Sequence, residues 1–249
     1  MPSLRIRRRL AALCLMLLPV AASHAQSGDA AHFYAYQPKP GQAPAFEEGY
    51  RHHLDWHRAH HDALAWYAWT IEDGPHAGWF VDASLGEPFA AFDRRVDPAG
   101  DGADFARTAA PHATPTARPT YRLLRAFSTG APLEEQHPSS QVEVTYVQVR
   151  PGTERRFERV LAALHRTLAH AKDAPPHTWY RLVVGGETPQ YMLMVPRTDW
   201  ASYDAFPEGL ERRLAGDPAA LADLAVSVRE MRSETWRYRP DLSLLPGTP

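Results

Sequence analysis

The second half of the chain shows the clearest alternation of hydrophobic and polar positions. Residues 142–149 alternate with a period of two, which is typical of a β-strand with one buried face. Pro151 and Gly152 follow as a turn signal, and from Phe157 to Leu168 the apolar residues recur with the spacing of a helix. This stretch therefore predicts a strand, a tight turn and an amphipathic helix.

Beyond this helix the pattern predicts a strand hairpin, a helical segment and a closing strand. Gly185 and Gly186 mark the hairpin turn, and Pro207 and Pro218 interrupt the helical segment. The predicted elements, in chain order, are strands at 178–184 and 190–195, a helical segment at 200–231 and a strand at 235–239.

The first half repeats this order at a fixed offset of 111 residues. Its predicted elements are a strand at 33–36, a helix at 45–63, a strand that begins near Ala65 and a last strand at 121–125; a loose segment at 97–119 predicts a shorter second helix. The matched pairs include Pro40-Gly41 with Pro151-Gly152, Phe46-Glu47 with Phe157-Glu158, and Phe92-Asp93 with Tyr203-Asp204. A register held along this length predicts a tandem duplication.

Each copy thus predicts the order β-α-β-β-α-β, which is the ferredoxin-like motif. Such a sheet has one face covered by helices and one bare apolar face, and two copies can cover each other. We expect an α+β protein in which two ferredoxin-like units, about 32–128 and 141–243, pack sheet to sheet as a pseudo-dimeric α+β barrel. The predicted boundaries are a signal peptide at 1–25, repeats at 26–130 and 141–249, and a linker at 131–140.

This order of strand, Pro-Gly turn, helix, Trp-Tyr strand, hairpin and strand resembles the dimeric α+β barrel superfamily, near the NIPSNAP-like and antibiotic-biosynthesis-monooxygenase-like proteins. The resemblance covers nearly the whole chain after the signal peptide. It implies a fold rather than one activity, because members include small-molecule monooxygenases, haem degraders and proteins of no known activity. In several of them a ligand lies between the sheet and a helix, with a helix histidine facing it.

The first 25 residues are typical of a secretory signal peptide. Arginines at positions 5 and 7–9 precede an apolar run at 10–22 that is too short for a permanent membrane span. Small residues at Ser23 and Ala25 predict cleavage before Gln26. We therefore expect a periplasmic or secreted protein that has no membrane contact after cleavage.

Cleavage changes the charge and the chemistry of the chain. The signal peptide holds four arginines and no acid, which leaves 23 basic and 29 acidic residues and a net charge of about −6. Binding to a phosphate backbone needs a basic surface, so we expect no nucleic-acid partner. Cys14 is the one cysteine of the sequence, and its removal excludes disulfides and thiolate catalysis.

A histidine-rich stretch at 49–69 is the candidate site. Under the offset of 111, His53 and His57 match Leu164 and Leu168, which are core positions of the second helix. On a helix, His53, His57 and His60 share a sector of about 80° that faces the predicted sheet. An unpaired buried imidazole costs about 1–3 kcal/mol, so these side chains need partners.

We expect His53 and His57 to be the catalytic residues of a small-molecule pocket between this helix and the first sheet. Aromatic side chains nearby are predicted to bind the ligand. They are Tyr34, Tyr36, Tyr50, Trp66 and Trp69, with Asp55, Asp62, Glu72 and Asp82 as acids that could pair with the imidazoles.

Three interpretations of the histidines stay open. They can be ordinary residues at a solvated rim, or bases in metal-free acid–base or oxygenase chemistry on an organic ligand. They can also form a haem or transition-metal site, for which His57, His60 and His61 are the candidate ligands. No H-E-x-x-H motif occurs, so zinc-protease chemistry is not indicated.

The favoured function is an exported, monooxygenase-like protein that binds a small molecule. The alternatives are a non-catalytic binding or interaction module, and a periplasmic metal- or haem-binding protein. A closed aromatic cavity beneath the helix would favour the first, whereas a filled core with histidines turned to water would favour the module. The ligand, the cofactor and the oligomeric state beyond the intrachain pair stay open.

Overall fold

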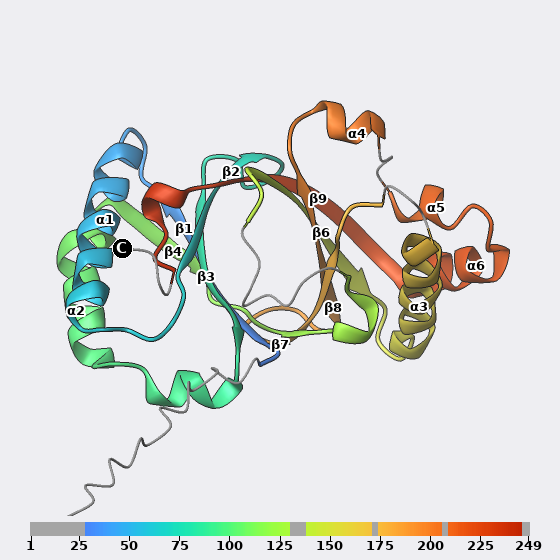
Figure 1. Ribbon diagram of the computed structural model, residues 1–249, viewed down its shortest axis with the longest axis horizontal. Coiled ribbons are helices and arrows are strands. Elements are labelled where there is room, and N and C mark those ends of the chain that lie inside the picture. The colour runs from blue at the N-terminus through green and yellow to red at the C-terminus, as the bar shows by residue number, and fades with distance from the viewer. Residues whose placement is uncertain (1–27, 130–137, 171–173, 206–208, 246–249) are drawn as a thin grey trace, which may run out of the picture.

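The computed structural model describes residues 28–129, 138–170, 174–205 and 209–245. In these residues the chain forms a closed barrel of eight antiparallel strands, with helices on two opposite sides (Figure 1). The predicted signal peptide and most of the predicted linker lie outside the described residues. No helix within the described ranges has the length and apolar character needed to cross a membrane.

The first half supplies four barrel strands in the order β5-β1-β3-β2, and β4 pairs beside β1. Its elements are β1 (Ala30–Pro38), α1 (Ala43–Ala59), β2 (Tyr67–Asp73), β3 (Phe80–Glu87), the 3-10 helix η1 (Phe89–Arg94), α2 (Pro98–Thr108), η2 (Ala110–His112), β4 (Ala113–Ala117), β5 (Thr120–Leu123) and η3 (Arg125–Phe127).

The second half supplies four strands in the order β9-β6-β8-β7. Its elements are β6 (Gln141–Val149), α3 (Glu154–His170), β7 (Thr178–Val184), β8 (Gln190–Arg197), α4 (Ala201–Ala205), α5 (Leu210–Arg213), α6 (Pro218–Ser227), β9 (Val228–Tyr238) and η5 (Pro240–Leu242). The bounds of β1, α1 and β2, moved by 111 positions, are those of β6, α3 and β7.

Two strand pairs between the halves close the barrel. β2 pairs with β9, and β5 pairs with β7, both antiparallel. The inward side chains of both halves meet in one apolar interior, where the Phe33 ring lies 6.4 Å from the ring of Tyr180 and the Trp69 ring lies 5.8 Å from that of Trp236. The two halves therefore share one core.

The helices cover the outer faces of the barrel (Figure 1). α1 and α2 lie over the first half, and α3, α5 and α6 lie over the second. Between α3 and its sheet the space is filled by apolar side chains such as Leu164 and Trp179. The corresponding layer of the first half instead contains the histidines.

Several predicted boundaries were wrong, each for a local reason. α1 ends at Ala59 because His61 adopts a left-handed φ of 53°, which breaks the helix before the predicted end at residue 63. β9 begins at Val228, so Met231 belongs to a strand rather than to a helix. The predicted interruption at Pro218 is present, because α5 ends at Arg213 and Pro218 starts α6 after the capping residue Asp217.

Candidate functional site

Strand alternation decides which side chains reach the layer between the helices and the first sheet. On β1, Phe33 points into the barrel, whereas Tyr34 and Tyr36 point to the helix side. On β3, Asp82 lies between the inward-facing Val81 and Ala83 and also faces the helices. The period of two thus places two tyrosines and one carboxylate under α1.

Trp69, predicted to bind the ligand with Trp66, lies on the other face of the sheet. Its ring belongs to the barrel interior, whereas Trp66 contacts the helix layer. The reason is geometric: two residues three positions apart on a strand have opposite orientations. Tyr34, Tyr36, Tyr50 and Trp66 do line one cavity, and Trp69 does not line it.

α1 and α2 approach each other closely at Gly49. A Cβ atom at this position would lie 2.1 Å from the carbonyl oxygen of Thr108, so no larger residue fits without moving a helix. This contact sets the distance between the histidines of α1 and the acids of α2.

The segment at 97–119 was predicted to hold a shorter second helix, and α2 is a regular helix of 11 residues there. Asp97 caps it by accepting a hydrogen bond from the Gly100 backbone N–H at 3.1 Å, and Pro98 occupies the first turn. Asp101 and Asp104, three positions apart, therefore lie on one helix face, and both are buried.

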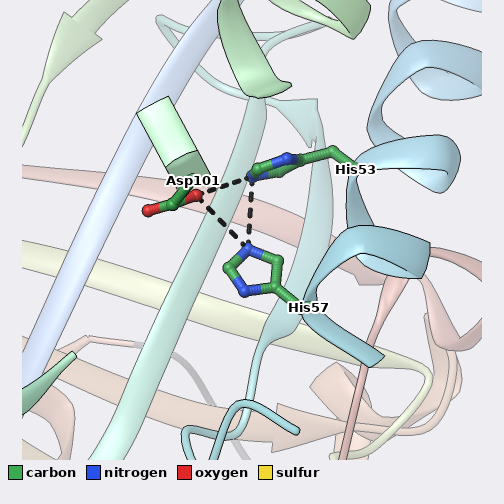
Figure 2. A group of neighbouring side chains, drawn as sticks. All are labelled: His53, His57 and Asp101. Carbon is green, nitrogen blue, oxygen red and sulfur yellow. Dashed lines mark hydrogen bonds and ion pairs between the residues drawn. The ribbon is translucent and has the colours of Figure 1, made fainter. Parts of the chain in front are cut away.

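His53, His57 and Asp101 converge on one point, as Figure 2 shows. The Nε2 atoms of the two imidazoles are 3.2 Å apart. Asp101 Oδ1 lies 3.1 Å from His53 Nε2 and 3.6 Å from His57 Nε2. Both histidines are buried, with 5% of His53 and 2% of His57 exposed.

The other nitrogen of each imidazole is bound to a second carboxylate. His53 Nδ1 lies 2.9 Å from Asp104 Oδ2, and His57 Nδ1 lies 2.8 Å from Asp62 Oδ2. An ionised carboxylate only accepts hydrogen bonds, so both Nδ1 atoms carry the hydrogen. In each neutral ring the Nε2 lone pair then points at the common centre.

The outer carboxylates are themselves held in place. Asp62 accepts hydrogen bonds from Trp66 Nε1 at 3.0 Å and from the Leu64 backbone N–H at 3.1 Å. Arg107 binds the free oxygen of Asp104, and Arg95 binds that of Asp101. The orientation of each imidazole is therefore fixed by two layers of polar contacts.

The polar contacts outweigh burial in the protonation of these groups. Burial lowers the pKa of His53, but its hydrogen bonds to Asp101 and Asp104 raise the pKa above its ordinary value. Burial raises the pKa of Asp101, but the His53 hydrogen bond and the Arg95 charge hold it below the usual range. Asp62 likewise has a lowered pKa, because the hydrogen bond from His57 overcomes its burial.

A cavity of about 160 Å³ lies beside this cluster. His53, His57 and Asp101 line it, and Arg95 donates a hydrogen bond at 3.3 Å to the hydroxyl of Tyr34 in its wall. The full lining is Tyr34, Tyr36, Tyr50, His53, His57, Trp66, Asp82, Arg95, Pro98, Asp101, Gly102, Phe105 and Arg118.

Asp82 is the most unusual titratable group of the cavity. It is 2% exposed, it binds Tyr50, and its Oδ1 has no hydrogen-bond partner among the described residues. Burial raises the pKa of Asp82 to about 7, against the lowering effects of the Tyr50 hydrogen bond and the His53 charge. A carboxylate with a pKa near neutrality can accept or donate a proton at physiological pH.

His60 and His61 do not join His57, contrary to the predicted trio of metal ligands. The helix ends before them, and both side chains are exposed. His60 stacks on Trp56 with ring centroids 3.9 Å apart, and its Nδ1 lies 2.8 Å from the Trp56 carbonyl oxygen. The third group beside the two imidazoles is Asp101.

The sequence interpretation missed Asp101, Asp104 and Arg95. A signal was present, because Asp97-Pro98 is a helix start and acids follow at its fourth and seventh positions on one face. Of the acids considered there, Asp62 and Asp82 belong to the site, whereas Glu72 contacts Arg237 and Asp55 contacts Arg58 outside it.

The residues suit a single metal ion better than a haem group. Ligating atoms of His53, His57 and Asp101 all lie within 4.8 Å of one another. A flat macrocycle would have to enter between two Nε2 atoms 3.2 Å apart. The 160 Å³ cavity is also smaller than usual cofactor sites of about 300–1,000 Å³. Haem therefore does not fit this site.

Comparison with known proteins identifies the fold type through solved structures. No protein-family model matches the chain, and no curated protein matches its sequence. A crystal structure of a proposed monooxygenase from Lactobacillus acidophilus NCFM matches with a TM-score of 0.56 and 10% identity, over 88% of this chain and 97% of that chain. An anthrone oxidase-like protein matches with a TM-score of 0.56 and 14% identity, over 90% and 96%.

A proposed chlorite dismutase matches with a TM-score of 0.55 and 10% identity, over 86% of this chain and 96% of that chain. These likenesses establish a mixed α+β fold with a closed antiparallel barrel of the dimeric α+β barrel type. At such low identity they establish the fold alone.

Proposed function

We propose that this is an exported, monooxygenase-like enzyme that binds a small aromatic molecule in the cavity between α1, α2 and the first sheet. One observation carries the proposal. His53, His57, Asp82 and Arg95 converge on a cavity whose lining also includes five aromatic side chains. Their burial favours this proposal over a non-catalytic module with histidines turned to water.

The size of the cavity limits the substrate. Its 160 Å³ is close to the volume of about 150 Å³ that accommodates benzene in a protein interior. Tyr34, Trp66 and Phe105 offer flat apolar contacts, and the Asp82 carboxylate, whose Oδ1 is buried and unpaired among the described residues, would receive a hydroxyl group after a small side-chain movement. The substrate class that matches these groups is a phenol with a single ring.

The residues of the chain would perform the acid–base step. The O–H bond of the phenol breaks, its proton forms an O–H bond on Asp82, and the electron pair stays on the phenolate oxygen. Arg95, beside the hydroxyl of Tyr34, would stabilise the negative charge. The histidine face would lie against the ring carbon that reacts.

The oxidation follows the reaction class in the names of the neighbouring structures. Molecular oxygen converts the phenol to a quinone: one oxygen atom enters the ring, and the other leaves as water with the two hydrogens that the substrate loses. The substrate supplies all four electrons, so the overall reaction needs no external reductant.

The proposal includes an origin by duplication. The shared strand order of the two halves and the common 111-residue offset of three elements support it. The first copy would have become the catalytic half by exchanging leucines for His53 and His57, while the second kept an apolar layer. Export rests on the predicted signal peptide at 1–25.

Oxygen uptake with phenol and methylphenols as probes tests this function. The parent protein should consume oxygen and form quinone, and these phenols should quench the fluorescence of Trp66. Asp82→Asn should lower kcat at least tenfold, while the exposed pair His60→Asn/His61→Asn should behave as the parent. Absence of both phenol binding and oxygen uptake in the parent would contradict the proposal.

A further inference from the structure

We infer that His53 Nε2, His57 Nε2 and Asp101 Oδ1 bind one divalent first-row transition-metal ion. This inference rests on the proposed function for the role of the cavity, although metal binding itself can be measured without a substrate. It replaces the ligand set of His57, His60 and His61, which the exposed positions of His60 and His61 separate.

The donor atoms have the spacing of metal ligands. Bonds of about 2.0–2.1 Å in a tetrahedral arrangement separate neighbouring donors by about 3.3 Å. The three separations here are 3.1, 3.2 and 3.6 Å. An ion at the centre of this triangle therefore requires shifts of only a few tenths of an ångström.

The contacts of these side chains leave three donor atoms facing one another. Each Nδ1 atom lies beside its own carboxylate, and the two Nε2 atoms and Asp101 Oδ1 lie within 3.6 Å of one another. Nitrogen and oxygen atoms that face one another at this distance need a cation between them, either a metal ion or a shared proton. The metal ion and the proton make different predictions.

The surrounding contacts are those of an imidazole metal site. Imidazole ligands usually donate their second N–H to a carboxylate, which orients the ring and increases the basicity of the ligating nitrogen. Asp104 and Asp62 do this for His53 and His57. Arg95 holds the outer oxygen of Asp101, which leaves Oδ1 for the ion.

The site has an open side. All three ligands line the 160 Å³ cavity, so the positions that the protein leaves free face the substrate. Two imidazoles and one carboxylate with open positions are the donor set of mononuclear non-haem iron oxygenases, and the same donors also bind zinc and cobalt. When bound, the ion would supply a Lewis-acidic contact for a substrate oxygen beside Asp82.

Cobalt(II) is the direct probe, because its visible absorption reports the nitrogen and oxygen ligands around it. Chelator-treated parent protein is titrated with Co²⁺ and then with Zn²⁺ as a competitor. We expect one equivalent to bind, with absorption bands that Zn²⁺ abolishes. Replacement of the outer carboxylate, Asp104→Asn, should weaken binding about 10- to 100-fold.

The ligand variants are His53→Asn/His57→Asn and Asp101→Asn. Asparagine keeps an amide N–H close to the Nδ1 position, so the contacts to Asp104 and Asp62 survive while the ligating Nε2 is removed. Both variants should lose stoichiometric binding, and the matched control His60→Asn/His61→Asn should retain it. Circular dichroism and the thermal midpoint show whether each variant is folded.

The outcomes separate this inference from the proposed function. No stoichiometric Co²⁺ binding by the parent, or equal binding by folded His53→Asn/His57→Asn, would overturn the metal site and indicate a shared proton. Phenol oxidation that persists in chelator-treated protein would overturn the catalytic role of the ion but leave the proposed function standing. Metal binding without phenol binding would contradict the proposed function alone.

Discussion

The protonation of Asp82 in the site affects the folding stability of the whole protein. Its pKa rises from an ordinary 3.8 to about 7, because the folded protein buries its charge among Tyr50, His53, Asp101 and Arg95. The folded state therefore retains a proton that the unfolded chain loses between about pH 4 and pH 7. Folding stability decreases as pH rises through this window, and Asp82 destabilises the protein above it.

Replacement of Asp82 by asparagine should remove this cost. The free energy of unfolding of Asp82→Asn minus that of the parent should increase by about 1.4 kcal/mol per pH unit from pH 5 to pH 7. Above pH 7 this difference should level off. Urea unfolding at several pH values measures it. The exposed variant Asp55→Asn should show no such trend, and a flat difference for Asp82→Asn would mean that its pKa is ordinary.

At the scale of residues, the sequence predicted the histidine face and the nearby Asp62, but not the carboxylates that α2 supplies. Helical periodicity placed His53 and His57 toward the sheet, and the match to Leu164 and Leu168 marked them as unusual core positions. The partners Asp101 and Asp104 come from a helix about 50 residues away, so no local pattern connects them to the histidines. Trp69 was misplaced because strand alternation was not applied to it.

At the scale of elements, the site depends on how closely α1 and α2 pack. Gly49 lets the α1 backbone approach the last turn of α2, and the acids of α2 then reach the imidazoles of α1. The hydrophobic pattern predicted α1, β6, α3 and β7, whose apolar periodicity is strong. It predicted α2 only as a short helix somewhere within 97–119, and it did not predict β4, a strand of five residues with a proline at its centre.

Gly49→Ala should therefore damage both the fold and the site. The added methyl group meets the backbone of Thr108, and such overpacking costs typically about 1–3 kcal/mol of stability. Separation of the helices should also weaken Co²⁺ binding. Thermal unfolding and the cobalt titration measure the two effects.

Gly102 is a matched control on α2. A Cβ there would have no atom within 4 Å, so Gly102→Ala should raise stability by about 0.5–1 kcal/mol through helix propensity. Equal effects of the two substitutions would show that close helix contact does not constrain Gly49.

At the scale of the whole molecule, the two halves form one cooperative unit. Strand pairs β2–β9 and β5–β7 join them, and aromatic side chains of both halves meet in a common interior. The segment after β9 also returns to the first half: Leu242 is fully buried in its helix layer, and Arg239 binds Glu47 on α1. Neither half covers the inner face of its own sheet.

We therefore predict a single unfolding transition. In scanning calorimetry the calorimetric and van't Hoff enthalpies should agree, because each half exposes the inner face of its sheet when the other unfolds. Two resolved transitions, each assignable to one half, would show that the halves are independent domains.

The most direct test of a site built on His53 and His57 is native mass spectrometry, with metal analysis, of protein purified without chelators. The parent and the control His60→Asn/His61→Asn should each carry one bound metal ion or small molecule per chain, and folded His53→Asn/His57→Asn should carry none. The same bound mass on all three proteins would contradict a site built on His53 and His57.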